Sequence, residues 1–197
     1  MNNFNYKNEI LRKLIHLFDS VIPLSLLFFS KKLVLSILIP ITIIFITLDF
    51  ARHHISFLGN IYSTFFNIVT RDIEKKKNNF TGASYYLLGC SIVVFLFNNT
   101  NIIIASLLIM SISDSFAALV GVKFGKTKIY GNKSLEGSFA FYVSTIIILY
   151  FFINSLTGFE YMYISFLITL VELFSFYKIN DNLTIPVFGA IILTYLT

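Results

Sequence analysis

Residues 102–138 read IIIASLLIMSISDSFAALVGVKFGKTKIYGNKSLEGS. The stretch opens with an apolar run at 102–121, which as a helix is long enough to cross a membrane. An aspartate interrupts this run at position 114, and a loop with several lysines and glycines follows it. A second apolar run then opens at 138, directly after Glu136 and Gly137. Two apolar helices joined by a short basic loop predict an all-α membrane protein with a polar site at one membrane face.

The composition of the whole chain supports this prediction. The chain has 197 residues, of which 56% are hydrophobic and only 13% charged, and its mean hydropathy is +0.80. Soluble domains carry about 25% charged residues. Apolar runs lie at 14–29, 33–49, 82–97, 102–121, 138–154, 161–177 and 183–196. We therefore expect one domain over residues 1–197, built as a polytopic transmembrane bundle of about seven spans, with an interfacial helix at 55–70.

The distribution of basic residues predicts the orientation of the bundle. With the N-terminus in the cytoplasm, all of the 15 Lys and Arg residues except Lys31 and Lys32 fall on the cytoplasmic side. The net charge of +5 thus belongs to membrane-facing loops and does not indicate nucleic-acid binding. Nearly all polar clusters fall on the same side, as expected for a cytosol-facing site that acts on a membrane substrate. A transporter would place polar groups near the bilayer midplane.

Asp114 is the first candidate site residue. An ionisable group within a membrane span is costly and by default marks a function, here binding Mg²⁺ or accepting the proton of a substrate hydroxyl. Ala118, Gly121 and Gly125 follow it along one helix stripe. The Gly121-x-x-x-Gly125 spacing permits close helix approach, so a packing seam is the alternative interpretation.

The loop at 123–134 has the ingredients of a phosphate site. Gly125 and Gly131 are six positions apart and Asn132 separates Gly131 from Lys133, so these residues do not have the spacing of a P-loop, but the loop combines glycines, lysines and a following helix N-terminus. A basic loop that touches anionic lipid head groups is the alternative. The candidate nucleotide-binding residues are Gly121, Gly125, Lys126, Lys128, Gly131, Lys133, Ser134, Gly137 and Ser138.

Further polar residues lie near the cytoplasmic ends of other spans. One face of the first helix carries a stripe that favours contact with protein, although snorkelling towards the interface is an alternative. Helix capping is the alternative for Thr81 and for Asp181 and Asn182, and an i,i+3 ion pair with Asp49 is the alternative for Arg52. These candidates are Glu9, Arg12, Lys13, His16, Arg52, Arg71, Glu74, Thr81, Gly82, Glu172, Asp181 and Asn182.

Taken together, these motifs resemble the CTP-dependent membrane lipid kinases: dolichol kinase, phytol and farnesol kinases, and the fungal CTP-dependent diacylglycerol kinase. The resemblance covers nearly the whole chain in order. Its most specific part is residues 111–138, where Asp114 is followed by Lys-Ser-Leu-Glu-Gly-Ser at 133–138. The matching motifs are Glu9-x-x-Arg-Lys-x-x-His16, Arg71-x-x-Glu74, Thr81-Gly-Ala-x-Tyr-Tyr86, Asp114-Ser-x-Ala-Ala-x-x-Gly-x-x-x-Gly-Lys126 followed by Gly131-Asn-Lys-Ser-Leu-Glu-Gly-Ser138, Glu172 and Asp181-Asn-Leu-Thr-Ile-Pro186.

The resemblance implies an integral membrane enzyme that transfers the γ-phosphoryl group of CTP to a membrane lipid alcohol, with Mg²⁺ or another divalent cation. The acceptor is an isoprenoid alcohol such as phytol, farnesol or polyprenol, or diacylglycerol. The lysines of the loop would hold the triphosphate. The catalytic candidates are Asp114, Glu136, Lys133, His16 and Arg71, and the candidate metal ligands are Asp114 and Glu136. A phosphatidate cytidylyltransferase and a non-enzymatic transporter or scaffold remain alternatives, and the oligomeric state stays open.

Overall fold

The computed structural model describes residues 3–57, 59–60, 62, 80–131, 133–174 and 180–197, with side chains from residue 10 onwards. The N-terminal half contains α1 (Asn3–Phe18), α2 (Val21–Ser25), α3 (Lys31–His54) and α5 (Gly82–Leu96). There follow α6 (Thr100–Leu108), the π-helical turn η1 (Ile109–Ser113), α7 (Asp114–Phe124) and a hairpin of β1 (Lys128–Tyr130) and β2 (Lys133–Ser134). The chain ends with α8 (Leu135–Phe152), α9 (Gly158–Leu173) and α10 (Asp181–Leu196). The described part is almost entirely helical, which confirms the all-α prediction.

Side-chain caps determine where most of these helices begin. A hydroxyl or amide oxygen just before the helix accepts a hydrogen bond from a backbone N–H of the first turn, which otherwise has no partner. Thr157 also forms a reciprocal capping box with Glu160 at the start of α9. The capping residues are Ser30, Thr81, Asn99, Ser134, Thr157 and Asn180.

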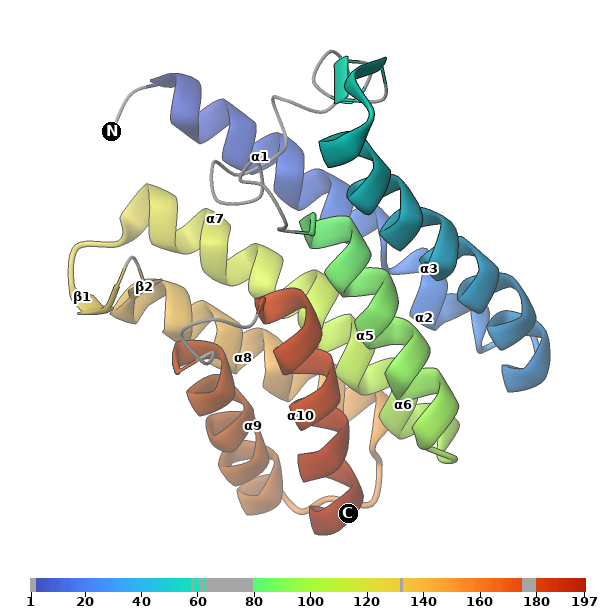
Figure 1. Ribbon diagram of the computed structural model, residues 1–197. Coiled ribbons are helices and arrows are strands. Elements are labelled where there is room, and N and C mark those ends of the chain that lie inside the picture. Colours follow the sequence, from blue (N-terminus) through green and yellow to red (C-terminus); the bar gives the residue numbers. More distant parts are fainter. Residues whose placement is uncertain (1–2, 58, 61, 63–79, 132, 175–179) are drawn as a thin grey trace.

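The centre of the bundle is the continuous helix formed by α6, η1 and α7 (Figure 1). The segment from Ile102 to Met110 is buried on every side, as expected for an apolar helix surrounded by other helices. Helix α8 packs against α7, α1 also contacts α7, and α10 contacts α5, α6 and α9. The predicted run at 102–121 therefore supplies the core of the fold.

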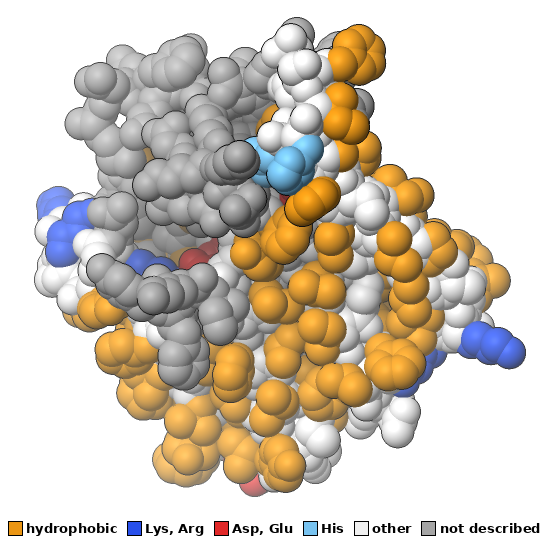
Figure 2. Space-filling model, in the orientation of Figure 1, with side chains coloured by type: hydrophobic (Ala, Val, Ile, Leu, Met, Phe, Trp, Pro, Cys, Tyr) orange, Lys and Arg blue, Asp and Glu red, His pale blue; other side chains and the backbone are white. Residues whose placement is uncertain are grey.

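The outer surface of the bundle is apolar. Large side chains such as Phe28, Phe95, Tyr150 and Phe159 are more than half exposed, and apolar side chains cover most of the described surface in Figure 2. Three described helices are long and apolar enough to cross a membrane: Lys31–His54, Thr100–Phe124 and Leu135–Phe152. Helices α5 and α10 are apolar but shorter. An apolar exterior of this extent indicates a membrane protein.

The expectation of about seven spans is only partly met. The run at 14–29 is not one helix, because α1 ends at Phe18 and α2, which contains Pro23, is five residues long. The run at 161–177 forms α9, which ends at Leu173. Most of the segment 55–70 lies outside the described residues. The number of spans and the cytoplasmic N-terminus therefore stay predictions.

The two ends of the bundle differ in chemistry. At one end α3 ends and α5 and α10 begin, and Arg52, Thr81 and Asp181 lie at these helix ends. At the other end Lys31 donates hydrogen bonds to the carbonyl oxygen of Phe97 (2.6 Å) and to Asn98 Oδ1 (3.2 Å). The predicted gathering of polar groups towards one end is thus visible in the fold.

Asp49 ties α3 to the start of α5. Its Oδ2 atom accepts hydrogen bonds from Thr81 N (2.7 Å), Thr81 Oγ1 (2.8 Å) and Ser84 Oγ (2.6 Å). Its Oδ1 atom lies 3.1 Å from Arg52 Nε, and both charged side chains are buried. The expected Asp49–Arg52 pair is confirmed, and it is part of a larger network that holds the N-terminus of α5.

We expect Asp49→Asn to lower the free energy of unfolding by about 3–5 kcal/mol, because the buried Arg52 loses its carboxylate and the amide matches the three donors poorly. The single cysteine, Cys90, is fully buried, so a thiol-reactive dye reports unfolding in detergent. The control is Thr47→Ala on the same helix, which removes an exposed hydroxyl bonded to the Ile44 carbonyl and should change stability by less than about 0.5 kcal/mol. Equal melting curves for both variants would show that the network contributes little.

Candidate active site

An ion pair between Lys13 of α1 and Asp114 of α7 lies at the centre of the candidate site. Both side chains are largely buried, with 2% and 12% of their surfaces exposed. Asp114 is the first residue of α7, directly after the π-turn η1. Turns of this type inside α-helices frequently mark functional sites. The predicted interior location of Lys13 is confirmed, and snorkelling towards the membrane surface is wrong for this residue.

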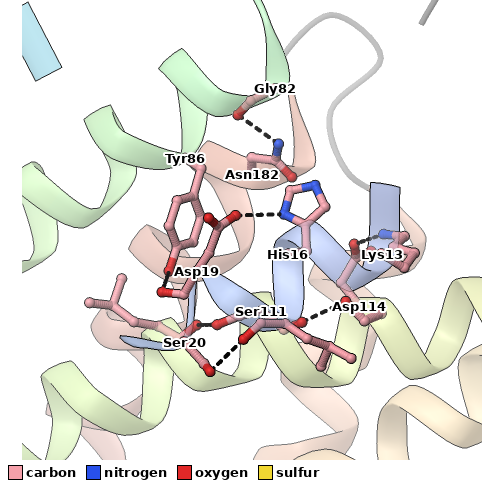
Figure 3. Close-up of polar contacts among 12 residues, drawn as sticks. Lys13, His16, Asp19, Ser20, Gly82, Tyr86, Ser111, Asp114 and Asn182 are labelled. Atoms are coloured by element: carbon pink, nitrogen blue, oxygen red, sulfur yellow. Dashed lines mark hydrogen bonds and ion pairs between the residues drawn. The ribbon is translucent and has the colours of Figure 1, made fainter. Parts of the chain in front are cut away.

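His16 lies one turn further along α1, between the Lys13–Asp114 pair and Asp19 (Figure 3). Its Nδ1 atom is 3.3 Å from Asp19 Oδ2. Tyr86 of α5 packs edge-on against the imidazole at 6.3 Å between ring centroids, and its hydroxyl donates to the Asp19 carbonyl oxygen (2.9 Å). The imidazole is therefore held in place by two other parts of the chain.

A second ion cluster joins β2, α9 and α10. Lys133 Nζ lies 2.8 Å from Glu172 Oε1 and 3.6 Å from Asp181 Oδ2, and it also donates to the Glu172 carbonyl oxygen. Burial alone would lower the pKa of Lys133, but the carboxylates of Asp181 and Glu172 outweigh that effect and raise it above its usual value. Lys133 thus carries its positive charge throughout the neutral range.

The two clusters form one electrostatic unit. Asp114 lies within electrostatic range of both His16 and Lys133, and also of Glu172. Residues from α1, α7, β2, α9 and α10 that are far apart in sequence therefore contribute charges to one site. Grouped charges of both signs in a largely buried site are typical of functional centres.

Helix capping does not explain Asp181 and Asn182, because Asn180 is the residue that caps α10. The Oδ1 atom of Asn180 accepts a hydrogen bond from Asn182 N at 3.0 Å. Asp181 instead faces Lys133, and Asn182 Nδ2 donates to the carbonyl oxygen of Gly82 at 2.8 Å. Asn182 thereby connects the start of α10 to the start of α5. The capping interpretation of Thr81 is confirmed by its bond with Ser84 N (3.3 Å).

Glycines bring α7 and α8 into close contact beside the clusters. A Cβ atom on Gly137 would lie 2.8 Å from the Ala117 carbonyl oxygen and 3.2 Å from the Gly121 Cα. A Cβ atom on Gly125 would lie 2.6 Å from Ser134 Oγ. The packing seam expected from the glycine spacing is therefore present, and it places the β1–β2 hairpin next to the end of α7.

The hairpin carries the exposed basic residues. Lys128 pairs with Ser134 and Tyr130 with Lys133 in an antiparallel register, and Gly131 takes a φ of 55° at the turn. The side chains of Lys126 and Lys128 are exposed. Positive charge at the start of α8 favours an anionic ligand there.

Glu136 holds the loop that leads into the hairpin. Its Oε1 atom accepts from the backbone N–H groups of Lys126 (3.1 Å) and Thr127 (3.2 Å), and Oε2 lies 3.4 Å from the Thr127 nitrogen. Ser138, one turn into α8, is buried, and its Oγ has no hydrogen-bond partner among the described residues. Glu136 thus has a structural task besides the metal-binding role that the sequence predicts for it.

Some predicted site residues are not part of the charge cluster. Arg52 and Thr81 belong to the Asp49 network, and Arg12 is half-buried on α1. Arg71 and Glu74 lie outside the described residues, as does the side chain of Glu9. Sequence reasoning quoted Tyr86 only as part of a family motif and did not identify Ser84. Their contacts, with Asp19 and with Asp49 of α3, join residues far apart in the chain.

Comparison with known proteins identifies relatives of this chain. Residues 13–177 match the model of the Cytidylyltransferase family. An uncharacterised protein of Rickettsia prowazekii is 37% identical over 94% of this chain and 93% of its own length. The CTP-dependent diacylglycerol kinase 1 of Schizosaccharomyces pombe is 29% identical over 98% of this chain and 95% of its own. The dolichol kinase of the same yeast is 33% identical over 53% of this chain and 23% of its own.

No solved structure matches this chain significantly. The family match covers both ion clusters except Asp181. A relative named as a CTP-dependent diacylglycerol kinase matches nearly the whole chain, and one named as a dolichol kinase matches about half of it. The chain therefore belongs to the cytidylyltransferase family, and its resemblance to the CTP-dependent lipid kinases is confirmed.

Proposed function

We propose that this protein transfers the γ-phosphoryl group of CTP to the hydroxyl of a membrane lipid alcohol. The observation that carries the proposal is the buried ion pair between Lys13 and Asp114, together with the Lys133 ion cluster and the basic glycine hairpin that contains Lys133. Phosphoryl transfer asks the protein mainly to position two reactants and to neutralise phosphate charge, and this site offers both. The names of the fungal relatives support CTP as the donor and a lipid as the acceptor.

In this mechanism the lysines of the hairpin, Lys126, Lys128 and Lys133, bind the triphosphate together with the backbone of Gly125 and Gly131. Asp114 accepts the proton of the lipid hydroxyl as the oxygen forms its bond to the γ-phosphorus. The bond from that phosphorus to the bridging oxygen breaks, and CDP leaves. In this proposal His16 and Asp181 serve the acceptor and Arg12 binds phosphate, and the sequence-based proposal that Arg71 also binds phosphate is kept. The site faces the cytoplasm.

Mg²⁺ is the expected partner of the nucleotide. Among the described residues, no group of three or more His, Cys, Asp and Glu side chains is arranged to hold a metal. Mg²⁺ in nucleotide enzymes is usually bound by one or two carboxylates together with the phosphates, so the carboxylates of this site fit it. The ion would neutralise charge on the β- and γ-phosphates. Asp114 is the first candidate ligand, and Glu136 is the second.

The test uses purified protein in detergent with Mg²⁺ and γ-labelled CTP or ATP. The acceptor panel contains diacylglycerol, phytol, farnesol, geranylgeraniol and a polyprenol. We expect label in one lipid class with CTP. Labelled lipid with ATP but not with CTP would support kinase activity and reject CTP as the phosphoryl donor. No labelled lipid with either nucleotide, from protein shown to be folded, would contradict the proposal.

A phosphatidate cytidylyltransferase is the second candidate, because the matching family is named for that chemistry. Such an enzyme would join CMP to phosphatidate and release pyrophosphate. Phosphatidate with α-labelled CTP separates the two activities, since a kinase leaves the α-phosphate in CDP and transfers none of it to lipid.

A further inference from the structure

Glu172 is a buried carboxylate with spare capacity to bind a ligand. Only 4% of the residue is exposed, and it lies in the last turns of α9, inside the bundle. Its Oε1 atom is engaged with Lys133, but its buried Oε2 atom has no hydrogen-bond partner among the described residues. An unpaired carboxylate oxygen in such a place is costly. It indicates a site built for a further positive group or donor.

Asp181 completes a pair of carboxylates around one position. It reaches Lys133 Nζ from α10, while Glu172 reaches the same atom from α9. An ammonium group held by two carboxylates marks a point where the chain stabilises a cation. Oxygen ligands from one or two carboxylates are also what Mg²⁺ uses when nucleotide phosphates supply further ligands.

The charge balance of the site changes when a triphosphate binds. Among the described residues, Asp114 pairs with Lys13, and Glu172 and Asp181 share Lys133. If Lys133 turns to the phosphates, as the proposed function requires, both of its carboxylates lose their cation. Two unpaired carboxylates next to a polyanion would repel it. A divalent cation at the former position of the ammonium restores the balance.

We infer that Glu172 and Asp181 hold the divalent cation of the nucleotide, and that Lys133 exchanges with it on nucleotide binding. The inference rests on the proposed function but assigns the metal to different ligands. Asp114 lies within electrostatic range of Glu172, whereas the carboxylate of Glu136 accepts hydrogen bonds from the backbone of Lys126 and Thr127 and is not needed for the metal. Lys133 is then a phosphate ligand in the complex and a placeholder for the cation before it.

The test measures binding of labelled CTP by equilibrium dialysis, without any lipid acceptor, in EDTA and in Mg²⁺. For the wild type we expect Mg²⁺ to tighten CTP binding. Glu172→Gln and Asp181→Asn should each reduce that gain by about 10- to 100-fold, the usual cost of disturbing a metal site. Binding in EDTA should persist in both variants, because neither carboxylate contacts the phosphates directly.

Two comparison variants sharpen the result. Glu160→Gln makes the same change at the opposite end of α9, where glutamine also fits a capping box, and it should keep the full Mg²⁺ gain. Glu136→Gln tests the other candidate ligand and should keep the gain as well. Loss of the gain in Glu136→Gln with retention in Glu172→Gln would overturn the inference.

The failures of the inference and of the proposed function are distinguishable. A wild type that binds no CTP with or without Mg²⁺ overturns both. A wild type with a Mg²⁺ gain that survives in Glu172→Gln and Asp181→Asn overturns the inference alone. Protection of Cys90 from a thiol dye verifies folding. If Glu172→Gln does not fold, Asp181→Asn decides, because its side chain is 23% exposed and tolerates substitution better.

Discussion

Asp114→Asn should lower turnover of the lipid alcohol by about 10²- to 10⁴-fold, the usual contribution of a positioned general base. The amide keeps the size of the side chain but has neither the charge nor the basicity of the carboxylate. It also leaves Lys13 buried without a counter-charge, at a cost of about 3–5 kcal/mol in the free energy of unfolding. Activity is measured with saturating CTP and the best acceptor at a temperature where the variant is folded.

A double variant separates the chemical effect from the structural one. Lys13→Gln together with Asp114→Asn replaces the ion pair by a neutral pair able to form a hydrogen bond, and such replacements of buried pairs are often neutral for stability. We expect the double variant to regain most of the lost stability and none of the lost activity. Near-normal turnover by Asp114→Asn would rule out the role assigned to this carboxylate.

Gly125→Ala should destabilise the protein by about 1–3 kcal/mol, the range for inserting a methyl group into a packed site. The new Cβ atom would lie 2.2 Å from the Gly121 carbonyl oxygen and 2.6 Å from Ser134 Oγ. Either the backbone of α7 near Gly121 or the Ser134 side chain must therefore move. Because Ser134 caps α8, the shift reaches the hairpin and the start of α8. We expect weaker CTP binding in the same dialysis assay, together with a lower melting temperature.

Gly158→Ala is the matched control for this substitution. It lies at the first position of α9, and nothing is within 4 Å of an added Cβ atom. Alanine there should leave activity unchanged and add up to about 1 kcal/mol of stability, since it restricts the unfolded chain. If Gly125→Ala behaves like this control, the close contact between α7 and the hairpin does not matter for the site.

The features that follow from local sequence were predictable. The apolar runs predicted an all-α membrane bundle, because a helix that crosses a bilayer needs a long apolar segment. The Gly121–Gly125 spacing predicted a close contact between helices. Asp114 was identifiable because a charge within an apolar run is rare. The partners of these residues were not, since Lys13 and Asp114 are 101 residues apart and no local pattern connects them.

The same limit explains the role of Asp49 and the correction at 181–182. Asp49 and Thr81 are 32 residues apart, so their bond depends on how α3 and α5 pack. Asp181 and Asn182 fit a helix cap by residue type, but Asn180 is equally suitable and is the one that forms it. Choosing between neighbouring caps depends on the direction in which the preceding chain arrives. That direction is set by tertiary packing.

The π-turn at Ile109–Ser113 shifts the phase of the central helix. It accommodates one more residue than an α-helical turn, and a residue of α-helix corresponds to a rotation of about 100° about the axis. Residues before and after the turn thus belong to two different angular registers, and a helical wheel drawn through both misplaces one half. With the extra residue in place, the carboxylate of Asp114 leaves the central helix in the direction of Lys13, while α6 before the turn stays surrounded by other helices. The direction of the carboxylate is therefore adjusted independently of the packing that anchors its helix.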